Sequence, residues 1–233
     1  INSDPAYADL VTKRLAEISG YPVGKAQNLI AATNDTTDFV SYSGQLKRLA
    51  VKISKICNDL RLLASGPRAG LNEINLPPMQ PGSSIMPGKV NPVIPEVMNQ
   101  VCFRVIGNDT TVMMASEAGQ LELNVFEPVM IYSILESISI LKNGMATLRL
   151  RCIDGIEANV EQCKELTYRS IGLVTALNPV LGYETSSDIA KTALKDNRSV
   201  YDLVLERGLL TKEVLDEILK PENMTQPKKM NKA

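Results

Sequence analysis

The chain has 233 residues, and its 25 Lys and Arg nearly balance its 26 Asp and Glu, which leaves a formal net charge of −1. This balance gives no indication of a nucleic-acid partner, because such partners require a strongly basic surface. No apolar run is long enough to cross a bilayer, so no membrane partner is expected. Histidine is absent, so this chain by itself cannot supply His-based acid–base catalysis or a His-ligated metal site.

The cysteines indicate a reducing compartment. No Cys-x-x-Cys pair is present, so buried free thiols are expected rather than disulfides. No signal peptide is recognised, and a cytoplasmic location is therefore expected. The four cysteines lie far apart along the sequence, in apolar surroundings that are typical of helices: Cys57, Cys102, Cys152 and Cys163.

Helical patterns begin near the start of the chain. A first helix is expected to stop at Gly20. A second, longer helix is predicted from about Asp35 or Thr36 to just before Gly66, and its apolar residues alternate at intervals of three and four, as in a long-helix bundle. Gly44 lies inside it at a cost of about 1 kcal/mol relative to Ala, so a packing reason is expected there. The apolar residues are Phe39, Tyr42, Leu46, Leu49, Ile53, Ile56, Leu60 and Leu63.

Two more long helices are predicted, over about 93–117 and 126–152. In the second of these, Leu135 and Ile140 lie off the main apolar stripe and form a second apolar face. A lone three-helix unit would leave that face exposed, so contact with other subunits is expected, and a wide stripe under a covering loop is the alternative. The residues predicted to face inward are Val97, Val101, Val105 and Ile106, followed by Ile131, Ile134, Ile138, Leu141, Met145, Leu148 and Cys152.

Beyond Gly155 the predicted helices become shorter, and turn residues separate them. The sequence therefore predicts an all-α fold in which a long-helix bundle over 1–154 is followed by a small C-terminal helical domain over 155–220. The polar stretch 221–233 lacks periodicity and is expected to be a frayed tail. The short helices are expected over 158–177, 185–195, 200–206 and 211–219.

The most informative segment is 82–92, which reads Gly-Ser-Ser-Ile-Met-Pro-Gly-Lys-Val-Asn-Pro. Glycines let a backbone approach a ligand closely and prolines fix its path, while hydroxyls, an ammonium and a carboxamide suit a site that grips a carboxylate. A phosphate-binding loop is excluded, because five residues separate Gly82 from Gly88 and Val90 follows Lys89. A Gly-x-Ser-x-Gly elbow is also excluded. An ordinary connector between helices remains the alternative.

This segment resembles the signature loop of the fumarase/aspartase superfamily, and it meets every fixed position of the pattern Gly-Ser-Ser-x-x-Pro-x-Lys-x-Asn. The resemblance continues on both sides and covers essentially the whole chain. Upstream, 58–62 and 65–71 are similar to class II fumarases and aspartases. Downstream, 91–101, 106–111 and 117–124 are similar to the aspartases in particular.

The resemblance implies an ammonia-lyase that reversibly eliminates ammonia from L-aspartate, in the anti sense, to give fumarate through an aci-carboxylate intermediate. It implies that Ser83 is the general base, whose alkoxide needs stabilisation by backbone N–H groups and a nearby lysine. It also implies that Lys89 and Asn91 grip a substrate carboxylate. Ser84 could donate to the other carboxylate, with an ordinary loop hydroxyl as the alternative.

Three further positions are expected to support these residues. Glu96 corresponds to an acid that pairs in the family with a histidine, which this chain lacks; a favourable charge near a helix N-terminus is the alternative interpretation. Gly82 and Gly88 are candidate hinges for a loop that closes over the substrate. No metal or organic cofactor is implied, because the substrate already carries an acidifying carboxylate and a leaving ammonium.

The resemblance also implies a homotetramer with composite active sites, each built from three subunits. Superfamily members carry a larger N-terminal portion, so this chain is expected to be a C-terminal fragment that is incompetent alone. Two alternatives to an aspartate ammonia-lyase remain open. One is a class II fumarate hydratase, which shares the loop and adds water instead of ammonia, and the other is a non-catalytic helical assembly module.

Overall fold

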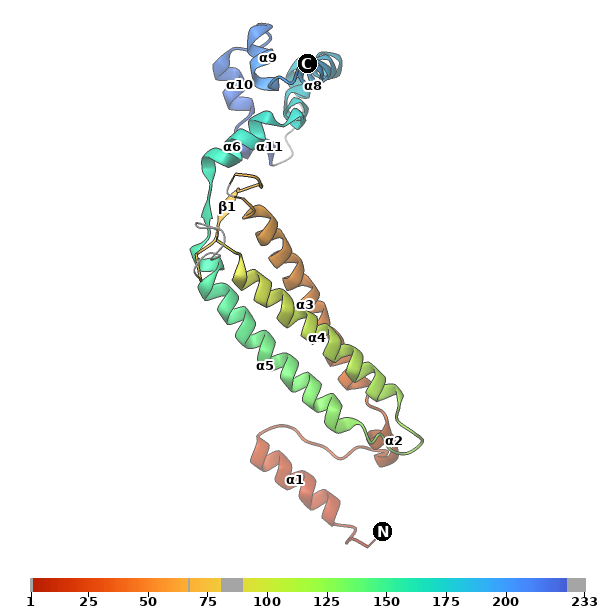
Figure 1. The fold of residues 1–233 in the computed structure, drawn as a ribbon. Helices are drawn as coiled ribbons and strands as arrows, with labels where there is room; N and C mark the ends of the chain where they lie inside the picture. Colours follow the sequence, from red (N-terminus) through yellow and green to blue (C-terminus); the bar gives the residue numbers. More distant parts are fainter. Residues whose placement is uncertain (1, 67, 81–89, 226–233) are drawn as a thin grey trace. The chain divides into compact units, whose positions relative to one another are not determined.

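The computed structural model describes residues 2–66, 68–80 and 90–225. Most elements in these ranges are α-helices (Figure 1), which confirms the predicted all-α fold. The sheet content is one antiparallel pair of two-residue strands, β1 (Ile74–Asn75) and β2 (Glu157–Ala158). Within the described ranges, no helix combines the length and apolar character needed to cross a bilayer.

The chain divides into two compact units. The first consists of Ile1–Leu62 and Leu76–Ile156, and the second consists of Leu63–Asn75 and Glu157–Ala233. A short segment from the middle of the sequence therefore belongs with the C-terminal helices, which the sequence pattern did not indicate. The domain boundaries proposed from the sequence remain predictions.

The first unit is built around three long helices that lie side by side (Figure 1): α3 (Thr37–Leu63), α4 (Val93–Glu117) and α5 (Glu127–Arg151). Their observed bounds agree with the predicted ones to within a turn, a difference at the level of how helix ends are assigned. Two shorter helices precede them, α1 (Tyr7–Ser19) and α2 (Leu29–Asn34).

The short N-terminal helices begin and end where local side chains dictate. Gly20 ends α1 with φ of 70° and donates its N–H to Ala16, as the sequence predicted. The helix α2 was not predicted. Its N-cap is Asn28, whose side chain accepts hydrogen bonds from the backbone N–H groups of Ile30 and Ala31.

The bundle core contains three of the four cysteines, although they lie far apart in the sequence. Cys57 on α3, Cys102 on α4 and Cys152 at the end of α5 are each at most 1% exposed. All four cysteines are free, as predicted, and Cys163 is half-buried in the second unit. The remaining buried members of this core cluster are Ala50, Ile53, Met98, Val105, Leu141 and Leu148.

The apolar repeat predicted for α3 is only partly buried within one copy of the chain. Three of its members are exposed: Tyr42 (50%), Leu49 (38%) and Ile56 (43%). The residue directly after each of them is buried instead, namely Ser43, Ala50 and Cys57. Residues that alternate at intervals of three and four form two neighbouring rows along a helix. Within one copy of the chain, only one of these two rows contacts other helices. Outward-facing members were also found among the stripes predicted for α4 and α5: Val97, Ile131 and Met145.

The packing reason expected at Gly44 is not found among the described residues, because a Cβ added there would meet none of their atoms within 4 Å. Gly144 on α5 has such a reason. A Cβ at Gly144 would lie 2.8 Å from the sulfur of Met98 and 3.4 Å from a methyl group of Val101. The missing side chain therefore lets α4 approach α5 closely.

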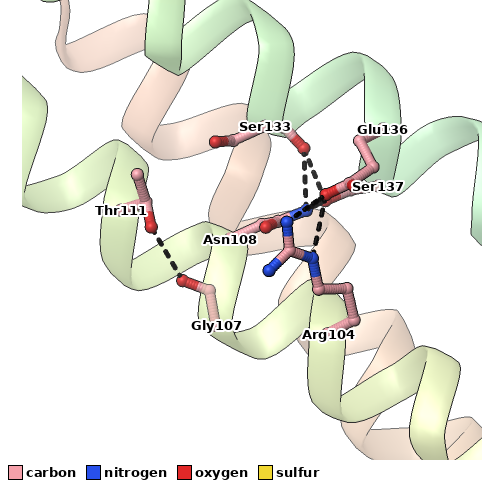
Figure 2. Close-up of polar contacts among 7 residues, drawn as sticks. All are labelled: Arg104, Gly107, Asn108, Thr111, Ser133, Glu136 and Ser137. Atoms are coloured by element: carbon pink, nitrogen blue, oxygen red, sulfur yellow. Dashed lines mark hydrogen bonds and ion pairs between the residues drawn. The ribbon is translucent and has the colours of Figure 1, made fainter.

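Buried polar side chains also join α4 to both neighbouring helices. Asn108 is 4% exposed, and its Nδ2 donates to the backbone oxygen of Ser133 (3.2 Å), to Ser137 Oγ (3.0 Å) and to Glu136 Oε2 (2.7 Å) on α5 (Figure 2). The hydrogen bond from Asn108, together with the Arg104 guanidinium, holds the pKa of Glu136 below its usual value. Such networks fix which residues lie opposite each other, because a buried donor without an acceptor is unfavourable.

The second unit is a cluster of short helices around Leu173, Leu177, Ile189 and Val204. The single helix predicted over 158–177 is interrupted at Ser170, which is extended and accepts the N–H of Gly172 on its hydroxyl. The elements are α6 (Val160–Arg169), α7 (Val174–Leu181), α8 (Tyr183–Asp196), α9 (Val200–Glu206), α10 (Lys212–Ile218) and α11 (Pro221–Met224), with 3-10 turns at Ile171–Leu173 and, in the first unit, at Ile153–Gly155.

Two further expectations for this unit are wrong. The helical segment predicted to end at residue 177 continues further, since Pro179 lies inside α7, which stops at Gly182 with φ of 77°. The stretch predicted as a frayed tail begins with α11, because Pro221 suits the first turn of a helix.

Candidate active site

Two of the seven predicted site residues, Asn91 and Glu96, belong to the described part of the chain. They lie at the N-terminal end of α4 in the first unit. Their environment therefore shows how the end of the motif is attached to the bundle. The other five lie outside the described residues: Gly82, Ser83, Ser84, Gly88 and Lys89.

Asn91 is tied directly to the first turn of α4. Its backbone oxygen accepts the N–H of Val93 at 2.9 Å, and the backbone oxygen of Pro92 accepts the N–H of Glu96 at 3.1 Å. Asn91 is half-buried and lines a small hollow together with Arg151 and Cys152 at the end of α5. The bond to Val93 closes a three-residue turn around the non-helical Pro92, so Asn91 lies directly before α4 and is attached to its first residue.

Glu96 lies in the first turn of α4 and is half-buried. Its carboxylate has no hydrogen-bond or ion-pair partner among the described residues. An acidic side chain is favourable at this end of a helix. A carboxylate in this position can accept a cationic or hydrogen-bonding partner supplied from outside the described residues.

The sequence analysis did not identify Asn99, which lies one turn beyond Glu96 and is 3% exposed. Its carboxamide makes contacts over more than one turn of α3, to Ser54, Asn58 and Arg61. An asparagine in the middle of a helix carries no local signal of such a role, because an exposed helical asparagine looks the same in sequence. Only its burial against α3 distinguishes it.

A cavity of about 600 Å³ lies elsewhere, in the second unit. It contains none of the predicted site residues, so we assign it no part in the chemistry that the motif indicates. The polar lining of this cavity consists of Glu73, Cys163, Thr167, Ser170, Thr175 and Asn223. Within the described ranges, no three His, Cys, Asp or Glu side chains gather closely enough to hold a metal ion.

Two family models match the chain. Residues 1–107 match the family described as Lyase, and residues 173–226 match the family described as Fumarase C C-terminus. Curated relatives include the aspartate ammonia-lyases of Helicobacter pylori, 62% identical over 97% of this chain, and of Pseudomonas aeruginosa, 62% identical over 98%. The aspartate ammonia-lyase of Escherichia coli K12 is 56% identical over 97%. The chain covers 48% of each, and so spans about half the length of these relatives.

Solved structures show the same fold. A fumarate lyase:delta crystallin from Brucella melitensis, bound to cobalt, is 54% identical with a TM-score of 0.90, and the match covers 97% of this chain and 49% of that one. A class II fumarase from Schistosoma mansoni is 32% identical with a TM-score of 0.82, and the match covers 96% of this chain and 50% of that one.

Proposed function

We propose that this chain, which belongs to the fumarase/aspartase superfamily, supplies about half of an aspartate ammonia-lyase that interconverts L-aspartate with fumarate and ammonia. The observation that carries the proposal is the identity of 62% to an aspartate ammonia-lyase over 97% of the chain, against 32% to a class II fumarase structure. The complete motif over 82–92 supports it, because the motif supplies the residue types that an elimination next to a carboxylate requires.

In the proposed reaction, the alkoxide of Ser83 takes a proton from Cβ of aspartate. The electron pair of the broken C–H bond moves toward the adjacent carboxylate and gives an aci-carboxylate, whose negative charge needs fixed donors. Lys89 supplies a positive charge and Asn91 a carboxamide N–H for that carboxylate. The electrons then form the Cα–Cβ double bond as the C–N bond breaks and ammonia leaves.

The roles of the remaining motif residues follow from the same scheme. Ser84 donates a hydrogen bond to the second carboxylate of the substrate, and Glu96 supports the site from the first turn of α4. Gly82 and Gly88 provide the backbone freedom for a loop that closes over the substrate. Asn91 is well suited to a fixed contact, because its backbone oxygen accepts the N–H of Val93, the first residue of α4.

We further propose that the protein works as a homotetramer with composite active sites. Apolar side chains on the long helices are exposed in the single chain, among them Tyr42, Leu49 and Ile56 at seven-residue spacing on α3 and Leu135 (60%) on α5. A heptad row of this kind is typical of a helix that packs against further helices. Other copies of the chain would cover it.

The test uses the protein at the full length of its relatives and follows the ultraviolet absorbance of fumarate. Fumarate is expected from L-aspartate and not from L-malate, and the 233-residue chain alone is expected to be inactive. Fumarate from malate alone would assign the protein to the hydratases. No turnover of either substrate by a folded full-length protein would favour a non-catalytic assembly module.

A further inference from the structure

The part of the bundle that follows the motif is held by a buried polar contact. Asn91 lies two residues before α4 and its backbone oxygen accepts the N–H of Val93, so the orientation of the first turn of α4 bears directly on where Asn91 lies. On the α5 side, α4 presents Met98, whose flexible side chain packs against Gly144. On the α3 side it presents Asn99.

Both the nitrogen and the oxygen of the Asn99 carboxamide form hydrogen bonds. Its Nδ2 donates to the backbone oxygen of Ser54 (3.1 Å), to Ser54 Oγ (2.9 Å) and to Asn58 Oδ1 (3.1 Å). Its Oδ1 accepts from Arg61 Nη1 at 3.4 Å. These partners extend over two turns of α3, so a shift of α4 along its axis or a rotation about it would break several bonds together.

We propose that Asn99 is a positioning residue for the proposed lyase reaction: by locking α4 to α3, it sets the orientation of Asn91 toward the substrate carboxylate. The inference rests on the proposed function for the reaction itself. The apolar contacts around Asn99 do not fix the orientation of α4 in the same way. Side chains such as Met98 can repack after a small rotation of the helix, whereas hydrogen bonds are directional.

The magnitude of the effect follows from helix geometry. Asn99 is six residues beyond Val93, the first residue of α4, or about 9 Å along the helix axis, so its hydrogen bonds fix the orientation of the first turns of α4 locally. A side-chain atom about 6 Å from the axis moves by about 1 Å when the helix turns by about 10°. A displacement of this size at a binding group can lower a rate by about 100-fold.

Asn108 provides a matched control. It is also a buried carboxamide on α4, with donor bonds to Ser133 and Ser137, but it lies nine residues farther from Asn91 and faces α5. Leucine has nearly the shape of asparagine, so Asn99→Leu and Asn108→Leu each remove one buried polar network with little change in volume. Both variants are expected to lose thermal stability to a similar extent.

The experiment measures kcat and KM for L-aspartate with the full-length protein. Asn99→Leu is expected to lower kcat/KM by about 10- to 100-fold, whereas Asn108→Leu stays within about threefold of the wild type. Because Asn99→Leu could fail to fold, a milder variant is included. Asn58→Ala removes one exposed partner of Asn99, and a loss of several-fold in kcat/KM is expected for it.

Hydrogen exchange gives a readout that is independent of catalysis. The hydrogen-bonded backbone amides near the start of α4, from Glu96 to Gln100, are expected to exchange faster in Asn99→Leu and Asn58→Ala than in Asn108→Leu. Equal losses of kcat/KM in Asn99→Leu and Asn108→Leu, or no loss in either, would overturn the positioning role. A wild-type protein inactive with aspartate would refute the proposed function, and unchanged exchange at these amides would then refute the positioning role separately.

Discussion

Asn108 and Asp109 are neighbours on α4 that bind opposite helices. Asn108 donates to Ser133 and Ser137 on α5, whereas the Asp109 carboxylate accepts from Ser43 Oγ (2.9 Å) and Lys47 Nζ (2.5 Å) on α3. These two consecutive residues thus fix α4 against both α3 and α5 at the same height along the bundle. Since a buried carboxylate is stable only when it is paired, this arrangement makes the bundle sensitive to the loss of a single cation.

Removal of Lys47 is therefore expected to destabilise the bundle more than removal of a surface lysine. The Asp109 side chain is 8% exposed, and Lys47→Ala would leave it with Ser43 alone. A loss of about 1–3 kcal/mol in the free energy of unfolding is expected, below the value for a fully buried pair because Lys47 itself is 46% exposed.

Lys55→Ala is the matched control, because the Lys55–Asp59 pair is solvent-exposed on both sides. A change below about 0.5 kcal/mol is expected for it. Urea unfolding measures both variants. Equal effects of the two substitutions would show that Asp109 does not depend on Lys47.

Two glycines in the long helices should respond oppositely to alanine. Gly144→Ala places a Cβ 2.8 Å from the sulfur of the buried Met98, so a loss of about 1 kcal/mol is expected because the flexible Met98 side chain must repack in a filled core. A Cβ at Gly107 meets no atom within 4 Å, and Gly107→Ala should stabilise α4 by up to about 1 kcal/mol. Thermal unfolding of both variants distinguishes these outcomes, and a stabilising Gly144→Ala would contradict the observed close packing.

The core thiols should be unreactive and should make stability depend on pH. Burial raises the pKa of Cys57 to about 11, and burial likewise raises the pKa of Cys102 and of Cys152. At pH 8, alkylation followed by mass spectrometry is expected to modify the half-buried Cys163 first. Rapid modification of Cys57 in the native protein would argue against its burial.

The pH dependence has a definite sign. From about pH 9 to pH 11 an unfolded chain would lose the proton of Cys57 while the folded chain retains it, because the folded pKa is the higher one. The free energy of unfolding is therefore expected to fall as the pH rises through this window. Other groups also titrate there, so the comparison is with Cys57→Ala, in which the fall should be smaller.

The motif serines should separate into a catalytic and a binding role. In the full-length protein, Ser83→Ala removes the proposed base and should lower kcat by about 100-fold or more. Ser84→Ala removes one hydrogen bond to the substrate, and its main effect is expected on KM for L-aspartate. Steady-state kinetics of both variants tests this difference, and a Ser83→Ala enzyme with wild-type kcat would exclude Ser83 as the base.

The exposed apolar face of α5 should matter for assembly. Leu135→Glu places a charge where the proposed homotetramer would bury a leucine, so a smaller assembly is expected in analytical ultracentrifugation. Leu194→Glu on α8 is the control, since Leu194 is similarly exposed in the single chain (66% against 60%). An unchanged tetramer in Leu135→Glu would place the subunit interface elsewhere.

The helices and the motif could be recognised from the sequence because their signals are local. The bounds of α4 follow from the proline and glutamate at its start and from its apolar repeat. The motif over 82–92 selects the candidate site residues through their fixed spacing. The predicted roles of these residues remain predictions, because spacing indicates a kind of chemistry and not the position of each atom.

Only the tertiary structure decided which of two possible faces of α3 is buried. The repeat of large apolar residues on α3 favoured Tyr42, Leu49 and Ile56, yet the small residues Ser43, Ala50 and Cys57 face the core, because small side chains allow the neighbouring helices to approach. The same dependence on distant partners explains why the gathering of Cys57, Cys102 and Cys152, the network of Asn99 and the membership of Leu63–Asn75 in the second unit were not predicted. Burial is a property of the contacts a residue makes, and those contacts come from segments that lie far away along the chain.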